Sequence, residues 1–141
     1  MRILALDYGE KNMGVAVSDP LGMTAGGLTV LKRESIKKDL LAIHTLVETY
    51  QVEKVVLGLP LNMDGSKGPA ALQVEAFARR LQGRLRVPVA LWDERLSTVA
   101  AERALLEGEV SRRERGKIID KMGAVIILQG YLDSGKAGAE Q

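Results

Sequence analysis

Four acidic residues stand at positions where a carboxylate can take part in chemistry. Asp7 ends the apolar run that opens the chain, and the pair Asp93 and Glu94 ends a later apolar run. Asp120 borders the apolar face of the last helix that the periodicity predicts. Converging carboxylates can hold two hard cations about 4 Å apart, one activating water and one stabilising a leaving oxygen. Phosphodiesters are natural substrates for such a site, and the metals are required because bare acids repel a phosphate.

Each acid also has a simpler structural explanation. Asp7 can be a turn residue that accepts hydrogen bonds from the backbone N–H groups that follow it. An acid at Asp93 or Glu94 can be stabilised by the dipole of the next helix. Because side chains alternate along a strand, only one of these two acids is expected to face Asp7, and the residues alone leave open which. Asp120 on its own is typical of a solvated or salt-bridged helix position.

Composition limits both the kind of protein and the kind of metal. The 141 residues suit one domain, expected over 1–133, with a small and polar tail over 134–141 that is expected to be flexible. The absence of cysteine excludes disulfides and thiolate metal sites. Oxygen ligands, or the single His44, must hold any metal, which favours magnesium or manganese over zinc. No stretch suits a membrane span, so we expect a cytoplasmic protein without a membrane partner.

The elements that must position the acids follow from the spacing of the apolar residues. Alternation and turn chemistry predict an antiparallel meander of three strands, and then two strands that are joined through helices. The order βββαβαβαα predicts an α/β fold with a mixed sheet flanked by helices. The predicted strands cover 2–7, 13–18, a strand ending at 28–31, 55–59 and 87–92. Helices are predicted after Ser35, near Pro69, over 98–107 and from Ile118, the last preceded by a charged linker over 108–116.

Basic residues accompany the candidate acids. Lys11, Arg95 and Lys121 each neighbour an acid or its loop, where they would neutralise phosphates or form a salt bridge to the adjacent acid. A further basic group lies in a predicted mobile loop before Asp120 and includes Arg112, Arg113 and Lys117. Such a loop suits gripping a nucleic-acid backbone without reading its sequence. The basic clusters over 32–38 and 79–86 indicate solvated helix faces instead.

Four segments, in this order along the chain, resemble the motifs of a known family. They read DYGEKNMGVAVSD from Asp7, GLPLNMDGS from Gly58, DERLST from Asp93, and DKMGA from Asp120 with ILQGYLD from Ile127. Together they span nearly the whole chain and resemble the YqgF/RuvX family. The resemblance implies an RNase H-like fold related to the resolvase RuvC, with a mixed five-stranded sheet in the order 3-2-1-4-5.

The resemblance also implies a function. It implies a metal-dependent nuclease that matures the 5′ end of precursor 16S rRNA, with Asp7, Glu94 and Asp120 as the catalytic acids and as ligands of Mg²⁺ or Mn²⁺. The expected partner is nucleic acid, precursor rRNA first and structured DNA second. Two alternative functions remain open: a resolvase of four-way DNA junctions, and an RNA-binding assembly factor without catalytic activity.

Other observations bear on these alternatives without deciding them. A junction resolvase should be a stable twofold dimer, whereas the sequence leaves open a monomer or a homodimer. The segment that begins at Asp7 also resembles the first phosphate motif of actin-like ATPases, but those need two such domains with nucleotide between them. Buried acids argue against an RNA-binding factor without catalysis, because binding alone gains nothing from negative charge.

The implied strand order makes one geometric demand. The first and fifth strands are separated by the fourth, and two strand spacings put their backbones about 10 Å apart. Asp7 and Glu94 must therefore lean across the fourth strand if they are to share metals. The end of that strand, Gly58-Leu59-Pro60, contains a glycine whose missing side chain leaves space for this.

Overall fold

The computed structural model describes residues 1–96 and 112–135, and it describes side chains over 1–95 and 122–135. The predicted helix over 98–107 and most of the predicted tail, 136–141, lie outside the described residues. None of the helices in the described part of the chain has the length and hydropathy that crossing a membrane requires.

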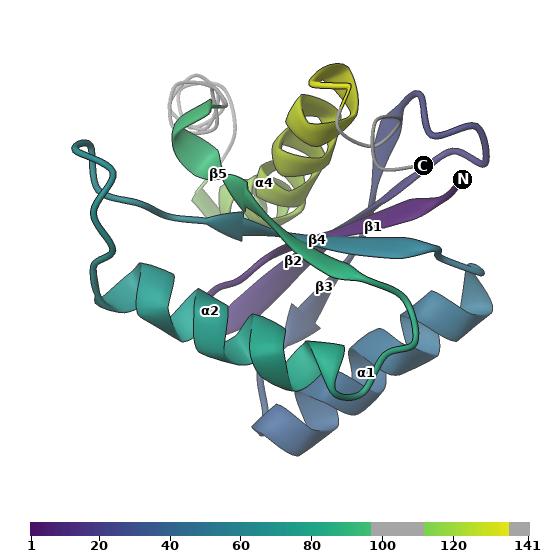
Figure 1. Ribbon diagram of the computed structural model, residues 1–141, viewed down its shortest axis with the longest axis horizontal. Helices are drawn as coiled ribbons and strands as arrows, with labels where there is room; N and C mark the ends of the chain where they lie inside the picture. Colours follow the sequence, from purple (N-terminus) through teal and green to yellow (C-terminus); the bar gives the residue numbers. More distant parts are fainter. Residues whose placement is uncertain (97–111, 136–141) are drawn as a thin grey trace.

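The sheet has five strands in the order β3-β2-β1-β4-β5, as predicted (Figure 1). The first three form an antiparallel meander, and the last two lie parallel to β1. Their bounds are β1 Ile3–Asp7, β2 Asn12–Ser18, β3 Ala25–Lys32, β4 Lys54–Leu59 and β5 Val89–Asp93. Because β1, β4 and β5 run in the same direction, their carboxyl ends meet at one edge of the sheet.

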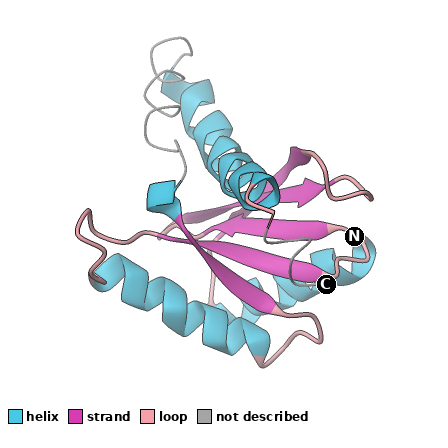
Figure 2. Cartoon of the chain, turned by 45° about the horizontal axis from the view of Figure 1, so that its top comes forward, coloured by secondary structure: helices cyan, strands magenta, loops and turns pink. Residues whose placement is uncertain are grey.

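Helices cover both faces of this sheet (Figures 1 and 2). Helices α1 (Ile36–Thr49) and α2 (Pro69–Gln82) lie on one face, and α4 (Arg112–Asp133) lies on the other. Ser35 caps α1 as predicted, because its Oγ accepts a hydrogen bond from the Lys38 N–H at 3.2 Å. Proline begins α2, where its missing N–H costs nothing.

The linker prediction over 108–116 is wrong for its second half. Helix α4 begins at Arg112, so the basic residues that were expected in a mobile loop belong to its first turns. The local sequence gives a reason, because Ser111 and Glu114 have the spacing of a capping box. That signal favours a helix start at this point over a loop. The predicted loop residues that belong to the helix are Arg112, Arg113 and Lys117.

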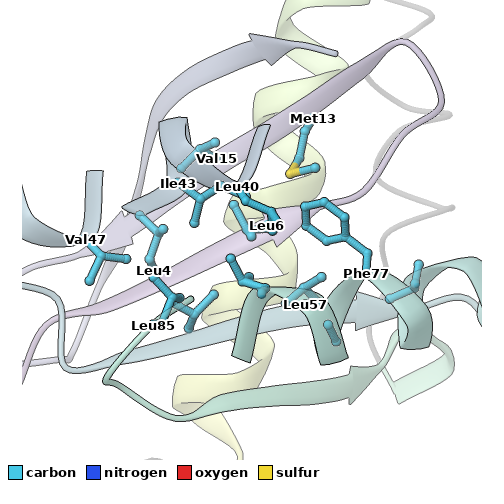
Figure 3. Close-up of a cluster of buried hydrophobic side chains, with 14 of the residues drawn as sticks. Leu4, Leu6, Met13, Val15, Leu40, Ile43, Val47, Leu57, Phe77 and Leu85 are labelled. Atoms are coloured by element: carbon cyan, nitrogen blue, oxygen red, sulfur yellow. The ribbon is translucent and has the colours of Figure 1, made fainter. Parts of the chain in front are cut away.

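The larger core lies between the sheet and helices α1 and α2 (Figure 3). Leu4 and Leu6 of β1 meet Ile43 of α1 and Phe77 of α2, and all four side chains are buried. These apolar contacts hold the helices on this face, because removing such side chains from water is the main stabilising term in folding.

The second core lies under α4. Ile3 and Ala5 of β1 pack with Trp92 of β5 and Tyr131 of α4, so Trp92 is a core residue as the sequence suggests. The Gln129 side chain also ties α4 to the start of β3: its Oε1 accepts from the Ala25 N–H at 3.1 Å. Since side chains alternate along β1, Asp7 belongs to the face that α4 covers.

Candidate active site at the carboxyl ends of three strands

Asp7 and Gly58 are neighbours across two parallel strands. Leu6 of β1 pairs with Leu57 of β4, so the next residues along each strand lie side by side at the carboxyl edge of the sheet. Gly58 in turn pairs with Trp92 of β5, two residues before Glu94. The edge therefore brings Asp7, Gly58 and the end of β5 together, as the parallel register requires.

The Glu94 carboxylate occupies the space that Gly58 leaves. A Cβ atom on Gly58 would lie 2.5 Å from Glu94 Oε1 and 2.5 Å from Ile127 Cδ1. The acid therefore folds back over β4, on the face covered by α4, beside the strand that carries Asp7. Glu94 thus leans across β4 towards β1, as the strand order requires if it is to share metals with Asp7. Ile127 lies on the helix side of the same space.

Asp93 points to a different partner. Its carboxylate accepts three hydrogen bonds from the Arg95 guanidinium, at 2.8, 3.1 and 3.2 Å. It also accepts one from the Arg95 backbone N–H at 2.9 Å. Hydrogen bonding to the guanidinium is the main reason that the pKa of Asp93 lies below its ordinary value. Of the two adjacent acids, Glu94 is thus the one placed over β4, while Asp93 is bound to Arg95.

Asp120 lies within α4, and its side chain is outside the described part of the chain. It precedes Ile127 by seven residues, nearly two helical turns, so both occupy the same face of the helix. It also precedes the fully buried Ala124 by one turn. The backbone therefore places Asp120 on the side of α4 that covers the sheet.

The donor set fits a hard cation in its chemistry. Asp7 and Glu94 offer carboxylate oxygens only, which suit magnesium or manganese better than zinc. No three histidine or acidic side chains gather as a metal site among the side chains that the structure describes. A cluster of three acids here would need Asp120 as its third member.

The predicted basic residues fall into two groups. Lys11 is exposed in the turn between β1 and β2, and Arg95 is held by Asp93, which is one of the two roles that the sequence left open for it. The remaining four lie in α4, with side chains outside the described range, and the backbone places them in the helix on either side of Asp120. They are Arg112, Arg113, Lys117 and Lys121.

Arg33 is a residue near the site that the sequence reasoning missed. Its Nε donates to the Asp39 carboxylate at 2.7 Å, and its Nη1 donates to the Gly9 carbonyl oxygen at 2.7 Å. Its guanidinium also lies 4.5 Å from the centre of the Tyr8 ring. Arg33 thereby fixes the turn that directly follows Asp7. Grouping Arg33 with the neighbouring lysines as a solvated face hid this role, and its distance in sequence from Asp7 and Gly9 gave no signal of it.

A cleft of about 340 Å³ opens beside Arg33, on the sheet face opposite to Asp7. Tyr8 and Phe77 line it with two arginines, Arg33 and Arg80. The rings of Tyr8 and Phe77 are 5.0 Å apart and tilted by 56°. The cleft and the two acids thus lie on opposite faces of the same strand end, separated by the backbone of Asp7 and Tyr8.

Known proteins resemble this chain over nearly its whole length. A family model described as RuvX, Holliday junction resolvase, matches residues 1–134. A Syntrophomonas wolfei protein named "Putative pre-16S rRNA nuclease" is 55% identical over 140 residues, 99% of each chain. A protein of the same name from Moorella thermoacetica is 56% identical over 133 residues, 94% of this chain and 95% of that relative.

Solved structures confirm the predicted RNase H-like fold. RuvC from T. thermophilus in complex with a Holliday junction substrate has a TM-score of 0.60 at 14% identity, covering 98% of this chain and 96% of that one. The fowlpox virus Holliday junction resolvase has a TM-score of 0.57 at 16% identity, covering 95% and 99%. At these identities the likeness is one of fold. The family match and the identity of the relatives show that this chain belongs to the RuvX family.

Proposed function

We propose that this protein is a nuclease that hydrolyses phosphodiester bonds in precursor 16S rRNA, at the 5′ end of the mature sequence. The observation that carries the proposal is the Glu94 carboxylate folded back over Gly58, beside the strand that ends in Asp7. The family and the names of the relatives supply the substrate. This assignment puts the protein in the cytoplasm, where ribosomes are assembled.

The proposed catalytic acids are Asp7, Glu94 and Asp120, which would hold Mg²⁺ or Mn²⁺. Bound divalent ions would supply water activation and neutralise the charge that develops on the scissile phosphate. The chain itself contributes position: β1 fixes Asp7, the gap at Gly58 fixes Glu94, and α4 brings Asp120 to the same face. Placing such groups on strands and a helix keeps their geometry constant, which is what positioning catalysis requires.

The basic residues would bind the nucleic-acid backbone. Four of them belong to the part of α4 that contains Asp120, and Lys11 lies in the turn after Asp7. Contacts of this kind fix position on the substrate and carry no sequence information. The proposed set is Lys11, Arg95, Arg112, Arg113, Lys117 and Lys121.

The second candidate is a resolvase of four-way DNA junctions, favoured by the description of the family model. Two nearby cuts in a symmetric junction require two active sites, and therefore a twofold dimer. The two candidates differ in substrate and in oligomeric state, so both can be measured on the same preparation.

The decisive experiment offers the protein a labelled RNA spanning the 5′ end of 16S rRNA and a synthetic four-way DNA junction, with manganese, magnesium or chelator. Glu94→Gln tests the site, and Glu48→Gln, on the exposed side of α1, is the matched control. Metal-dependent cleavage of the RNA that is lost in Glu94→Gln and kept in Glu48→Gln supports the proposal. Symmetric cutting of the junction alone moves the assignment to a resolvase. RNA binding without cleavage of either substrate under any metal condition contradicts both candidate functions.

A further inference from the structure

Met63 is presented to solvent at the carboxyl edge of the sheet. It lies in the β4–α2 loop, residues 60–68, which projects beyond the sheet at the end where β5 leads into the short helix η1 (Glu94–Leu96) (Figures 1 and 2). Met63 is 93% exposed, more than any other large apolar residue in the described part of the chain. An apolar side chain so placed gains nothing from the fold, which raises the question of what it contacts.

The loop that carries Met63 is internally ordered. The Asn62 N–H donates to the Ser66 carbonyl oxygen at 2.9 Å, and the Gly65 N–H donates to the Asn62 carbonyl oxygen at 2.9 Å. The Asp64 carboxylate accepts from the Ser66 N–H at 2.9 Å and from its hydroxyl at 2.6 Å. These bonds close the turn on both sides of Met63. The Met63 side chain is therefore exposed by a turn whose backbone is held in place by hydrogen bonds.

Arg95 fastens the same loop to the end of β5. Its Nη1 donates to the Met63 carbonyl oxygen at 3.2 Å, while the rest of the guanidinium is bound to Asp93. The loop can approach because residue 65 is a glycine with φ +87°, and a Cβ there would lie 3.3 Å from Arg95 Nη1. The Met63 backbone is thereby held at a fixed place beside the end of β5, where Arg95 directly follows Glu94.

We propose that Met63 contacts an unstacked nucleobase next to the bond that is cleaved, and holds that nucleotide apart from its neighbour. The inference rests on the proposed nuclease function and names the substrate feature that the site recognises: a single-stranded or opened segment with at least one splayed base. Arg95 is then a positioning residue that acts through the loop.

The chemistry of the side chain favours a base over other occupants. A thioether makes few favourable contacts with phosphates and sugars, whereas the face of a base is broad, polarisable and apolar. Methionine makes favourable contacts with aromatic faces, and it is among the side chains that wedge between bases. Proteins that recognise RNA commonly bind unstacked bases of single-stranded segments. A protein partner is disfavoured because a stable interface buries about 800 Å² on each side, far more than one methionine offers.

The test uses RNA with 2-aminopurine at positions flanking the cleavage site, and compares Met63→Ala with Met23→Ala. Met23 is the matched control, because it is 66% exposed and lies in the β2–β3 turn at the opposite edge of the sheet. Removing one contact between methionine and a base should lower kcat/KM about 2- to 13-fold. Met63→Phe should retain activity, because an aromatic ring also stacks. Thermal melting should be unchanged in all three variants, because the side chains are exposed.

A second readout does not need cleavage. In an Asp7→Asn background, bound RNA should show raised 2-aminopurine emission at one position, and Met63→Ala should abolish the rise while Met23→Ala keeps it. Equal cleavage and equal emission for the two alanine variants would overturn the inference, as would failure to bind RNA. A change of oligomeric state in Met63→Ala would identify a protein contact and also overturn it. If the wild-type protein does not cleave the RNA but the change in 2-aminopurine emission is observed, the result contradicts the nuclease proposal and leaves the Met63 contact standing.

Discussion

Gly58→Ala tests the central geometric claim, that the missing side chain of Gly58 makes room for the Glu94 carboxylate. The new Cβ would lie 2.5 Å from both Glu94 Oε1 and Ile127 Cδ1, whereas ordinary contacts between heavy atoms are about 3.5–4.0 Å. Both partners, or the Gly58 backbone itself, must therefore move by about 1 Å. Overpacking of this kind costs about 1–3 kcal/mol of stability. A displacement of about 1 Å at a catalytic group costs about 100-fold in rate.

Two assays separate these effects. Denaturant unfolding gives the change in stability, and cleavage of the 16S precursor RNA gives the change in kcat/KM. The double variant Gly58→Ala with Ile127→Val removes the Cδ1 methyl and leaves the carboxylate contact in place. We expect it to recover most of the lost stability, so that the two substitutions together cost less than their sum. Cleavage should stay low in the double variant, because Glu94 is still displaced.

Two results would refute this reasoning. Wild-type cleavage by Gly58→Ala would mean that the position of Glu94 over β4 has no part in the reaction. Recovery of both stability and cleavage in the double variant would assign the effect to Ile127 packing alone. Ile127→Val by itself is the control, and it should cost about 0.5–1.5 kcal/mol with cleavage close to wild type.

Three further outcomes are expected. Arg33→Ala leaves the Asp39 carboxylate, 7% exposed, without its charged partner and should cost about 3–5 kcal/mol in denaturant unfolding; a loss under 1 kcal/mol would contradict the structural role of the pair. Ser18→Ala removes the acceptor for the buried Ile3 N–H at 2.8 Å and should cost about 1–3 kcal/mol, measured in the same way. The pKa of Asp93 is lowered by the neighbouring guanidinium, so its stabilising contribution is full above pH 3.8 and is lost as pH falls through the lower folded value; a carboxyl NMR titration with a midpoint at or above 3.8 would contradict this.

Sequence reasoning works well for the sheet because its signals are local. The short continuous apolar runs that become β1 and β4 are typical of buried strands, and the turn after Asp7 marks where the meander begins. The space at Gly58 also follows from sequence once the strand order is known. These features depend on residue type and neighbours along the chain, which a sequence displays directly.

The choice between Asp93 and Glu94 depends on geometry that a sequence does not display. Strand alternation stops at Asp93, and the helical turn η1 redirects Glu94 back over β4. The partner of Asp93 is set by the same turn, which brings the Arg95 guanidinium onto it. The role of Arg33 is likewise tertiary, because its contact with Gly9 spans 24 positions. Such contacts become visible only when the elements are placed in space.

The packing of α4 has a consequence for the order in which the protein matures. The face of the sheet that carries Ile3, Ala5 and Asp7 is closed by the last of the described elements to be synthesised, through contacts such as Gln129 with Ala25 across 104 positions. Chains emerge from the ribosome N-terminus first, and contacts of high sequence separation form late. A nascent chain can therefore build the α1–α2 core while the acid site still lacks Asp120 and its cover. Under the proposed function, an enzyme that acts on ribosomal precursors stays inert until its own α4 has been synthesised and has packed on the sheet.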